Sequence, residues 1–141
     1  MSIRIILTSV LVGDQEKAHR FYTDVLGFQT RHDIPCGDVR WLTVVAPCAP
    51  EGPELLLEPV NKESVGGLAL TYQAALHAEG IAAACFGVED VDSEIARLKG
   101  LGVRVTTEPT EAGPAKIAVI DDTCGNLIQL LQPMALAGSG E

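Results

Sequence analysis

The sequence lacks any long apolar run, although 47% of its 141 residues are hydrophobic. A membrane-spanning helix needs about 20 consecutive apolar residues, and no stretch of the chain approaches that length. The first four residues also contain too little apolar sequence to form a signal peptide. We therefore expect a soluble cytoplasmic protein that has no membrane partner.

Basic residues are scarce. The chain has 10 Lys and Arg against 19 Asp and Glu, which gives a formal net charge of −9. A surface of this sign repels phosphate backbones and anionic lipids. Nucleic-acid binding is therefore disfavoured, and the scattered acidic residues are expected to serve solubility.

Cysteine pairs and the common nucleotide-binding or catalytic motifs are also missing. The four cysteines form no C-x-x-C pair and no zinc-site spacing, so we expect reduced thiols at Cys36, Cys48, Cys85 and Cys124. The chain contains no G-x-S-x-G, P-loop or G-x-G-x-x-G motif. These absences remove the simplest routes to a hydrolase or a nucleotide-binding enzyme.

The chain does contain an internal repeat. Residues 7–28 run from an apolar segment through a helix-start Asp and an amphipathic stretch to Leu-Gly-Phe, and residues 83–103 repeat this order and end in Leu-Gly-Val. Asp14 and Asp90, which lie 76 residues apart, start the two helical stretches, and Asp14 is expected to cap its helix. Such a duplication implies two pseudo-symmetric halves with a site between them.

Hydrophobic periodicity predicts a β-α-β-β-β order in each half. The predicted strands are 3–12, 28–34, 39–45 and 54–60, then 81–88, 103–107, 115–120 and 127–131, with helices at 14–27 and 91–99 and within the connector. Residues 121–126 predict a hairpin loop. We expect one structural domain, 1–134, with a first module (1–60), a connector (61–80) and a second module (81–134), followed by a flexible tail (135–141).

This layout resembles the glyoxalase/bleomycin-resistance/extradiol-dioxygenase (vicinal oxygen chelate) superfamily. The motifs that carry the resemblance are Val12-Gly13-Asp14, Phe21-Tyr22, Leu26-Gly27-Phe28 and the run from Gly125 to Leu130, and they span residues 4–132. The resemblance implies an α+β fold in which two paired βαβββ modules form a curved mixed sheet around a central cleft. A divalent metal usually lies at the base of that cleft.

The resemblance also implies which positions would hold the metal. Two strands of each half supply one ligand each, and these four positions are occupied here by Leu7, Leu55, Ala83 and Gln129. Only Gln129 has a donor atom, whereas a divalent site needs three or more converging oxygen or nitrogen donors. We therefore predict no metal and no other cofactor.

The histidine and glutamate side chains do not form an obvious alternative set of metal ligands. The histidines do not pair at H-x-H or i,i+4 spacing and are expected to be surface or flanking residues (His19, His32 and His77). Glu54 and Glu58 form a tempting carboxylate pair. Strand alternation, however, places them opposite Leu55 and Leu57 and so away from the cleft, unless a bulge shifts the register.

Alternation then predicts a mostly apolar cleft, which is the usual makeup of a small-molecule pocket. Its predicted lining is Leu7, Ser9, Leu11, Leu55, Leu57, Ala83, Cys85, Gln129 and Leu131. Trp41 would stack on a planar ligand and Arg40 would meet an anionic group on it, with core packing and a solvated strand end as the respective alternatives. Tyr72 is either a lid residue or a helix-packing residue.

Two classes of function remain, and the missing metal ligands favour the first. It is a metal-free homodimer that binds a small hydrophobic, aromatic or antibiotic-like molecule, as the bleomycin-resistance members do. The second is a metal-dependent glyoxalase-like lyase or isomerase, or a dioxygenase-like enzyme. A weaker third possibility is a relic whose cleft has filled with side chains.

Overall fold

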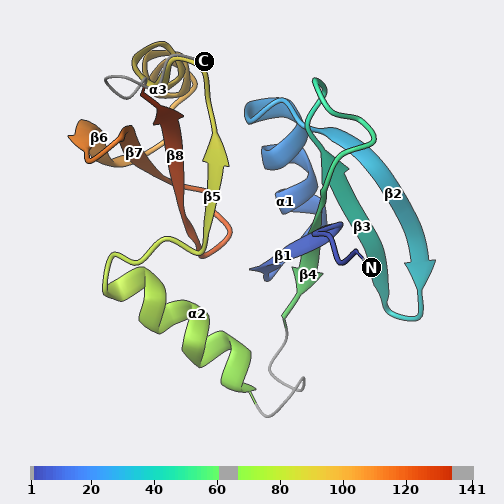
Figure 1. Ribbon diagram of the computed structural model, residues 1–141. Coiled ribbons are helices and arrows are strands. Elements are labelled where there is room, and N and C mark those ends of the chain that lie inside the picture. Colours follow the sequence, from blue (N-terminus) through green and yellow to red (C-terminus); the bar gives the residue numbers. More distant parts are fainter. Residues whose placement is uncertain (1, 61–66, 135–141) are drawn as a thin grey trace.

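The computed structural model describes residues 2–60 and 67–134, which fold into two βαβββ modules joined by a helix (Figure 1). The flexible tail predicted at 135–141 lies outside the described residues, as does the first part of the connector. The elements are β1 (Leu7–Val12), α1 (Gln15–Arg20), the π-helical turn η1 (Phe21–Val25), β2 (Gln29–Cys36), β3 (Val39–Val45), β4 (Glu54–Pro59), α2 (Leu68–Ala78), β5 (Ala84–Gly87), α3 (Val91–Gly100), β6 (Val105–Ala112), β7 (Ala115–Asp121) and β8 (Leu127–Pro133).

The predicted duplication is confirmed by the strand order. The first sheet runs β1-β4-β3-β2 and the second runs β5-β8-β7-β6, so the two modules have the same topology. In each sheet the first and last strands of the module pair in parallel and the remaining pairs are antiparallel. The α+β class is therefore confirmed. The strands form two separate four-stranded sheets, whereas the prediction joined them in one curved sheet.

The helix of each module begins where the sequence predicts. The carboxylate of Asp14 accepts a hydrogen bond from the Lys17 amide at 3.0 Å, and Asp90 accepts from the Ser93 amide at 3.2 Å. Each cap satisfies an amide that the first helical turn leaves unpaired. The first helix differs from a regular 3.6-residue pattern at its end, where it widens into η1 before Gly27 turns the chain at φ +87°.

A single hydrophobic core joins the two modules. Buried side chains of α1, β1, β3 and β4 form one cluster with those of α3, β7 and β8. Aromatic rings bridge the modules: Phe86 lies 5.3 Å from Phe28 and 6.4 Å from Tyr22 between ring centroids. Each sheet therefore turns its helix-covered face toward the common core, and its other face points away from that core.

The register between β1 and β4 decides which residues occupy each face of the first sheet. Leu7, Ser9 and Leu11 pair with Glu54, Leu56 and Glu58. The alternating residues, which include Val10, Leu55 and Leu57, belong to the core under α1. The expectation that Leu55 and Leu57 share a face with Leu7 and Ser9 was therefore wrong. Because β4 contains three consecutive leucines, either of its two faces could bury apolar side chains. Packing against α1 decides which face is buried. We call the face that carries Leu7, Ser9, Leu11, Glu54, Leu56 and Glu58 the outer face.

The predicted first strand is shorter in the structure. It begins at Leu7, because β4 begins at Glu54 and offers few partners beyond it. As a result, Ile3, Ile5 and Ile6 are exposed. Among the described residues, no helix combines the length and the apolar character that crossing a membrane would need.

The connector helix α2 is fixed to both modules by polar contacts. It lies beside the ends of β1 and β5 (Figure 1). The Gln73 amide group donates to the carbonyl of Leu11 at 2.8 Å and to that of Cys124 at 3.1 Å. Gly125 permits this approach, since a Cβ there would lie 2.8 Å from the Gln73 nitrogen. His77 adds a contact of 2.9 Å to Asp121.

Candidate functional site

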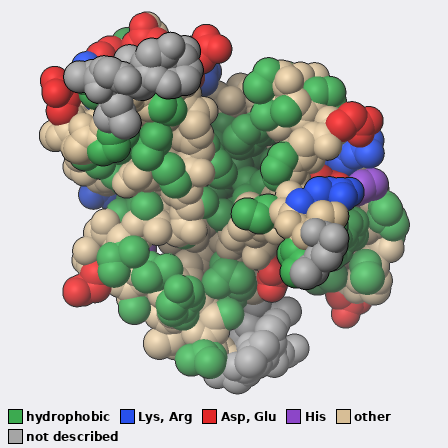
Figure 2. Space-filling view, in the orientation of Figure 1, with side chains coloured by type: hydrophobic (Ala, Val, Ile, Leu, Met, Phe, Trp, Pro, Cys, Tyr) green, Lys and Arg blue, Asp and Glu red, His purple; other side chains and the backbone are tan. Residues whose placement is uncertain are grey.

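A hollow of about 390 Å³ lies between the two modules, and we call it the crevice. The first module contributes residues of β1, β3 and β4 and the ring of Phe28, and the second contributes residues 83–87 around β5. Apolar side chains dominate its wall, among them Phe28, Val44, Leu55 and Phe86. In the space-filling view, hydrophobic side chains gather in the recess between the two modules (Figure 2). Its size and lining are typical of a small-molecule site.

Glu54 is the one carboxylate among the residues that line the crevice. Its Oε1 accepts a hydrogen bond from the Thr43 hydroxyl at 2.7 Å and lies 3.0 Å from His32 Nδ1. The Thr43 hydroxyl lowers the pKa of Glu54, partial burial opposes this by a smaller amount, and His32 lowers it further. Glu54 is therefore ionised at neutral pH and held in one position at the start of β4.

Cys85 is the other reactive group at the crevice. It is exposed, and the side-chain amide of Gln129 on the neighbouring strand β8 donates to its sulfur at 3.6 Å.

The other three cysteines lie in different surroundings. Cys36 and Cys48 are exposed away from the crevice, and burial, followed by the charge of Asp122, raises the pKa of Cys124 to about 12. A thiol reagent is thus expected to distinguish Cys124 from the other three.

Comparison with known proteins decides the family. The model of the Glyoxalase/Bleomycin resistance protein/Dioxygenase superfamily matches residues 4–130. The chain belongs to that superfamily. The resemblance inferred from the sequence motifs is therefore confirmed, and so is the fold that it implied.

Two bacterial proteins illustrate what the chain is similar to in sequence. YurT of Bacillus subtilis (strain 168), an uncharacterised protein, is 48% identical over 130 residues, which is 92% of this chain and 99% of YurT. The chain is also similar to a probable lactoylglutathione lyase of Vibrio parahaemolyticus, at 27% identity over 135 residues, 92% of this chain and 90% of that protein.

Solved structures also match nearly the whole chain, and we describe two of them. The crystal structure of UcmS2 superimposes with a TM-score of 0.80 at 31% identity, covering 93% of this chain and 98% of that one. TnmS3, an antibiotic binding protein from Streptomyces sp. CB03234, superimposes with a TM-score of 0.73 at 32% identity, covering 94% of this chain and 98% of that one.

The residues present do not fit the metal site that the superfamily resemblance implies. Leu7, Leu55 and Ala83 carry no donor atoms, Leu55 lies on the opposite face of the first sheet from Leu7, and Gln129 is engaged with Cys85. Throughout residues 2–60 and 67–134, no three His, Cys, Asp or Glu side chains are arranged to hold a metal ion. A hydrocarbon wall cannot replace the hydration of a divalent cation.

The structure brings together only part of the predicted lining. Leu55, Ala83 and Cys85 line the crevice, and Gln129 reaches it through Cys85. Leu57 is fully buried in the core, because the β4 register turns it toward α1. Ser9 lies in a neighbouring hollow beside α2, and Leu7 is 37% exposed on the outer face.

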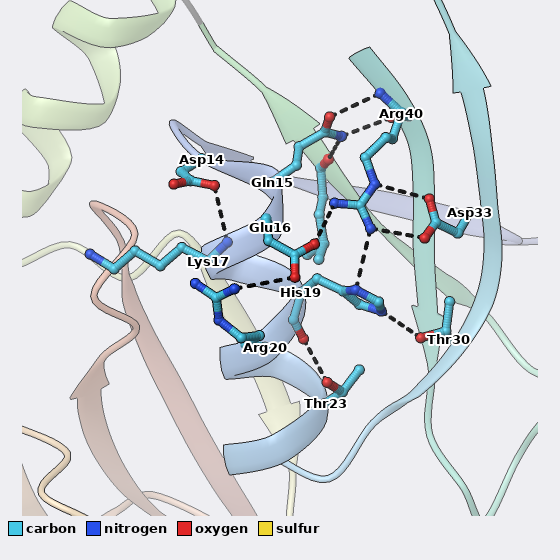
Figure 3. Close-up of polar contacts among 11 residues, drawn as sticks. Asp14, Gln15, Glu16, Lys17, His19, Arg20, Thr23, Thr30, Asp33 and Arg40 are labelled. Carbon is cyan, nitrogen blue, oxygen red and sulfur yellow. Dashed lines mark hydrogen bonds and ion pairs between the residues drawn. The ribbon is translucent and has the colours of Figure 1, made fainter.

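Arg40 is committed to a surface network on the helix side of the first sheet (Figure 3). Its guanidinium donates to both carboxylate oxygens of Asp33, at 3.0 and 2.8 Å, and to Glu16 at 2.9 Å. The side-chain amide of Gln15 donates to the backbone carbonyl of Arg40 and accepts from its backbone amide. The Asp33 hydrogen bonds raise the pKa of Arg40. Arg40 is not among the residues that line the crevice, because these partners hold it at the strand end.

Trp41 also lies outside the crevice lining. It pairs across β2 and β3 with Ile34 and is 41% exposed. The sequence reasoning missed the two phenylalanines that do line the crevice, Phe28 and Phe86. Phe28 follows the Leu-Gly motif and Phe86 alternates with Cys85, but only the packing of the modules brings their rings together.

Proposed function

We propose that this protein binds a small, mainly apolar and aromatic molecule in the crevice and uses no metal to do so. The observation that carries the proposal is the mainly apolar wall that includes Phe28, Leu55 and Phe86, with Thr8, Glu54 and Cys85 as the polar and thiol residues of the lining. Apolar burial supplies the binding free energy and the few polar groups orient the ligand. The similarity to TnmS3, described as an antibiotic binding protein, supports a ligand of antibiotic-like chemistry.

Occupation of the crevice should shield Cys85. We expect that a binding compound, found in a panel of aromatic metabolites and antibiotics, slows alkylation of Cys85 by iodoacetamide at least about tenfold, since the reagent needs access to the thiolate. Mass spectrometry of each cysteine reads the rates, and Cys36 and Cys48 in the same molecule are internal controls because both are exposed.

A larger residue in the crevice should weaken binding of such a compound. Gly87 lines the crevice, and a Cβ at Gly87 meets no atom within 4 Å. Gly87→Leu should therefore fold normally and weaken binding of the same compound by about tenfold, or about 1.4 kcal/mol. Gly100→Leu, at an equally open position at the end of α3, is the matched control. Equal binding by both variants would place the ligand elsewhere.

We further propose a homodimer. The outer face and the N-terminal segment expose Ile3, Ile5, Ile6, Ile34 and Trp41, and exposed apolar clusters of this kind mark association surfaces. Sedimentation equilibrium should give twice the 14.9 kDa of one chain, and Ile34→Asp should shift the protein toward the monomer. A monomer at all concentrations tested would refute this part of the proposal.

A glyoxalase-like lyase is the second candidate, favoured by the similarity to the probable lactoylglutathione lyase. Such an enzyme needs a metal that polarises a carbonyl and a base that moves a proton. The donor set described above does not fit that metal. Hemithioacetal isomerisation above background by the purified protein would restore this candidate.

A further inference from the structure

A second hollow lies between α2 and the outer face of the first sheet, and we call it the α2 groove. It consists of two adjoining spaces of about 350 and 330 Å³ that share Leu11 and Tyr72 in their walls. Ser9 and Leu11 of β1 form one side, and Tyr72 and Leu76 of α2 form the other. Hydrophobic side chains gather over α2 in the space-filling view (Figure 2).

The α2 groove carries one carboxylate. Glu58 pairs with Leu11 across β1 and β4, so it lies on the same face as Ser9 and Leu11. It is exposed, and it is the one residue with a charged side chain at neutral pH among the described residues that line the groove. A single carboxylate at the edge of an apolar surface favours a ligand group with positive charge, because the ion pair is strengthened where water is partly excluded.

Tyr72 supplies an aromatic surface in the same groove. Its side chain is 58% exposed, so it does not pack α2 onto the fold. Gln73, the next residue, holds the helix in place through its bonds to the carbonyls of Leu11 and Cys124. Tyr72 therefore lines the same hollow as Glu58, and an aromatic face attracts cations as well as planar rings.

Ala83 lines both the crevice and the α2 groove, so the two hollows adjoin at this residue. We propose that the ligand of this protein is an aromatic molecule with a cationic group, and that the cationic group binds in the α2 groove between Glu58 and Tyr72. This inference rests on the proposed binding function and names its ligand class. The net charge of −9 acts in the same direction, since it attracts cations toward the surface.

Two probes of matched shape test the proposal. 9-Aminoacridine is a planar cation at neutral pH, and acridine is its neutral parent. By isothermal titration calorimetry we expect the wild-type protein to bind the cation about tenfold more tightly than the neutral ring. Glu58→Gln should bring the two affinities to within about twofold of each other, and Tyr72→Ala should weaken binding of both probes.

Glu89→Gln is the matched control, because it removes the same charge from an exposed position that does not line the groove. It should retain the preference for the cation. Equal affinities for the two probes in the wild type, the same preference in Glu58→Gln, or no binding of either probe would overturn the inference. If compounds of the wider panel still protect Cys85 in those cases, the crevice proposal stands and only the ligand class is wrong.

Discussion

Replacing Asp122 with alanine is expected to lower the free energy of unfolding by about 3 kcal/mol, through loss of several buried hydrogen bonds at once. Asp122 is fully buried in the turn before β8. Its Oδ2 accepts from the Tyr22 hydroxyl at 2.6 Å and from the Asn126 amide group at 2.9 Å. Its Oδ1 accepts from the backbone amides of Cys124 and Asn126.

The alanine variant would leave the Tyr22 hydroxyl and the backbone amides of Cys124 and Asn126 without these acceptors in a largely buried site, while the Asn126 side chain would keep its bond to the Leu11 carbonyl. An unpaired buried donor costs about 1–3 kcal/mol. Burial, followed by the charge of Asp122, raises the pKa of Tyr22, so the phenol remains a neutral donor. Because Tyr22 belongs to the first module and Asp122 to the second, the loss should also loosen the contact between the modules that encloses the crevice.

Urea unfolding followed by circular dichroism measures the effect. Tyr22→Phe removes only one of the bonds and should cost about 1–1.5 kcal/mol. Asp24→Ala, at an exposed position of η1, should stay within about 0.5 kcal/mol of the wild type. An Asp122→Ala protein as stable as the Asp24→Ala control would show that the buried network does not stabilise the fold.

Leu57→Ala is expected to cost about 3 kcal/mol, since it removes a fully buried side chain and leaves a cavity that the neighbours fill only in part. Leu57 packs in the shared core with Val10, Val12 and the α1 residues. The same substitution at Leu7, on the outer face, should cost less than about 1 kcal/mol. Thermal and urea unfolding of the two variants therefore test the β1–β4 register directly.

Equal, small costs would have a clear meaning. If Leu57→Ala cost as little as Leu7→Ala, then β4 would be shifted by one residue, and Leu55 and Leu57 would lie on the outer face with Leu7, as the alternation in the sequence first suggested. The face that carries Glu58 would then turn toward α1, and the α2 groove would lose its carboxylate.

Local sequence patterns were sufficient to predict the helices and strands and their order along the chain. The Asp14 cap, the apolar periodicity, the hairpin turn after Asp121 and the repeat at 76 residues predicted two βαβββ modules, and the structure has them. These signals are short-range: a cap acts over three residues, and strand or helix periodicity is visible within one element. The leucines and alanine at the superfamily's metal positions were also readable directly from the sequence.

The composition of the site was only partly predictable. Leu55, Ala83 and Cys85 line the crevice as expected, while Arg40 and Trp41 do not. Arg40 illustrates the reason, because its partners Asp33 and Glu16 lie on two different elements and hold it on the helix side of the sheet. No pattern within one strand reports such a contact.

The sequence by itself determined the two modules, their helix starts and the absence of metal donors at the superfamily positions. Only the tertiary structure decided which face of β4 is buried, that Phe28 and Phe86 meet in one crevice, and that Tyr22 binds Asp122 one hundred positions later in the chain. The physical reason is range: helix caps and the apolar periodicity of a helix or strand are set by neighbouring residues, whereas strand register and the meeting of modules are set by how separate apolar surfaces pack together.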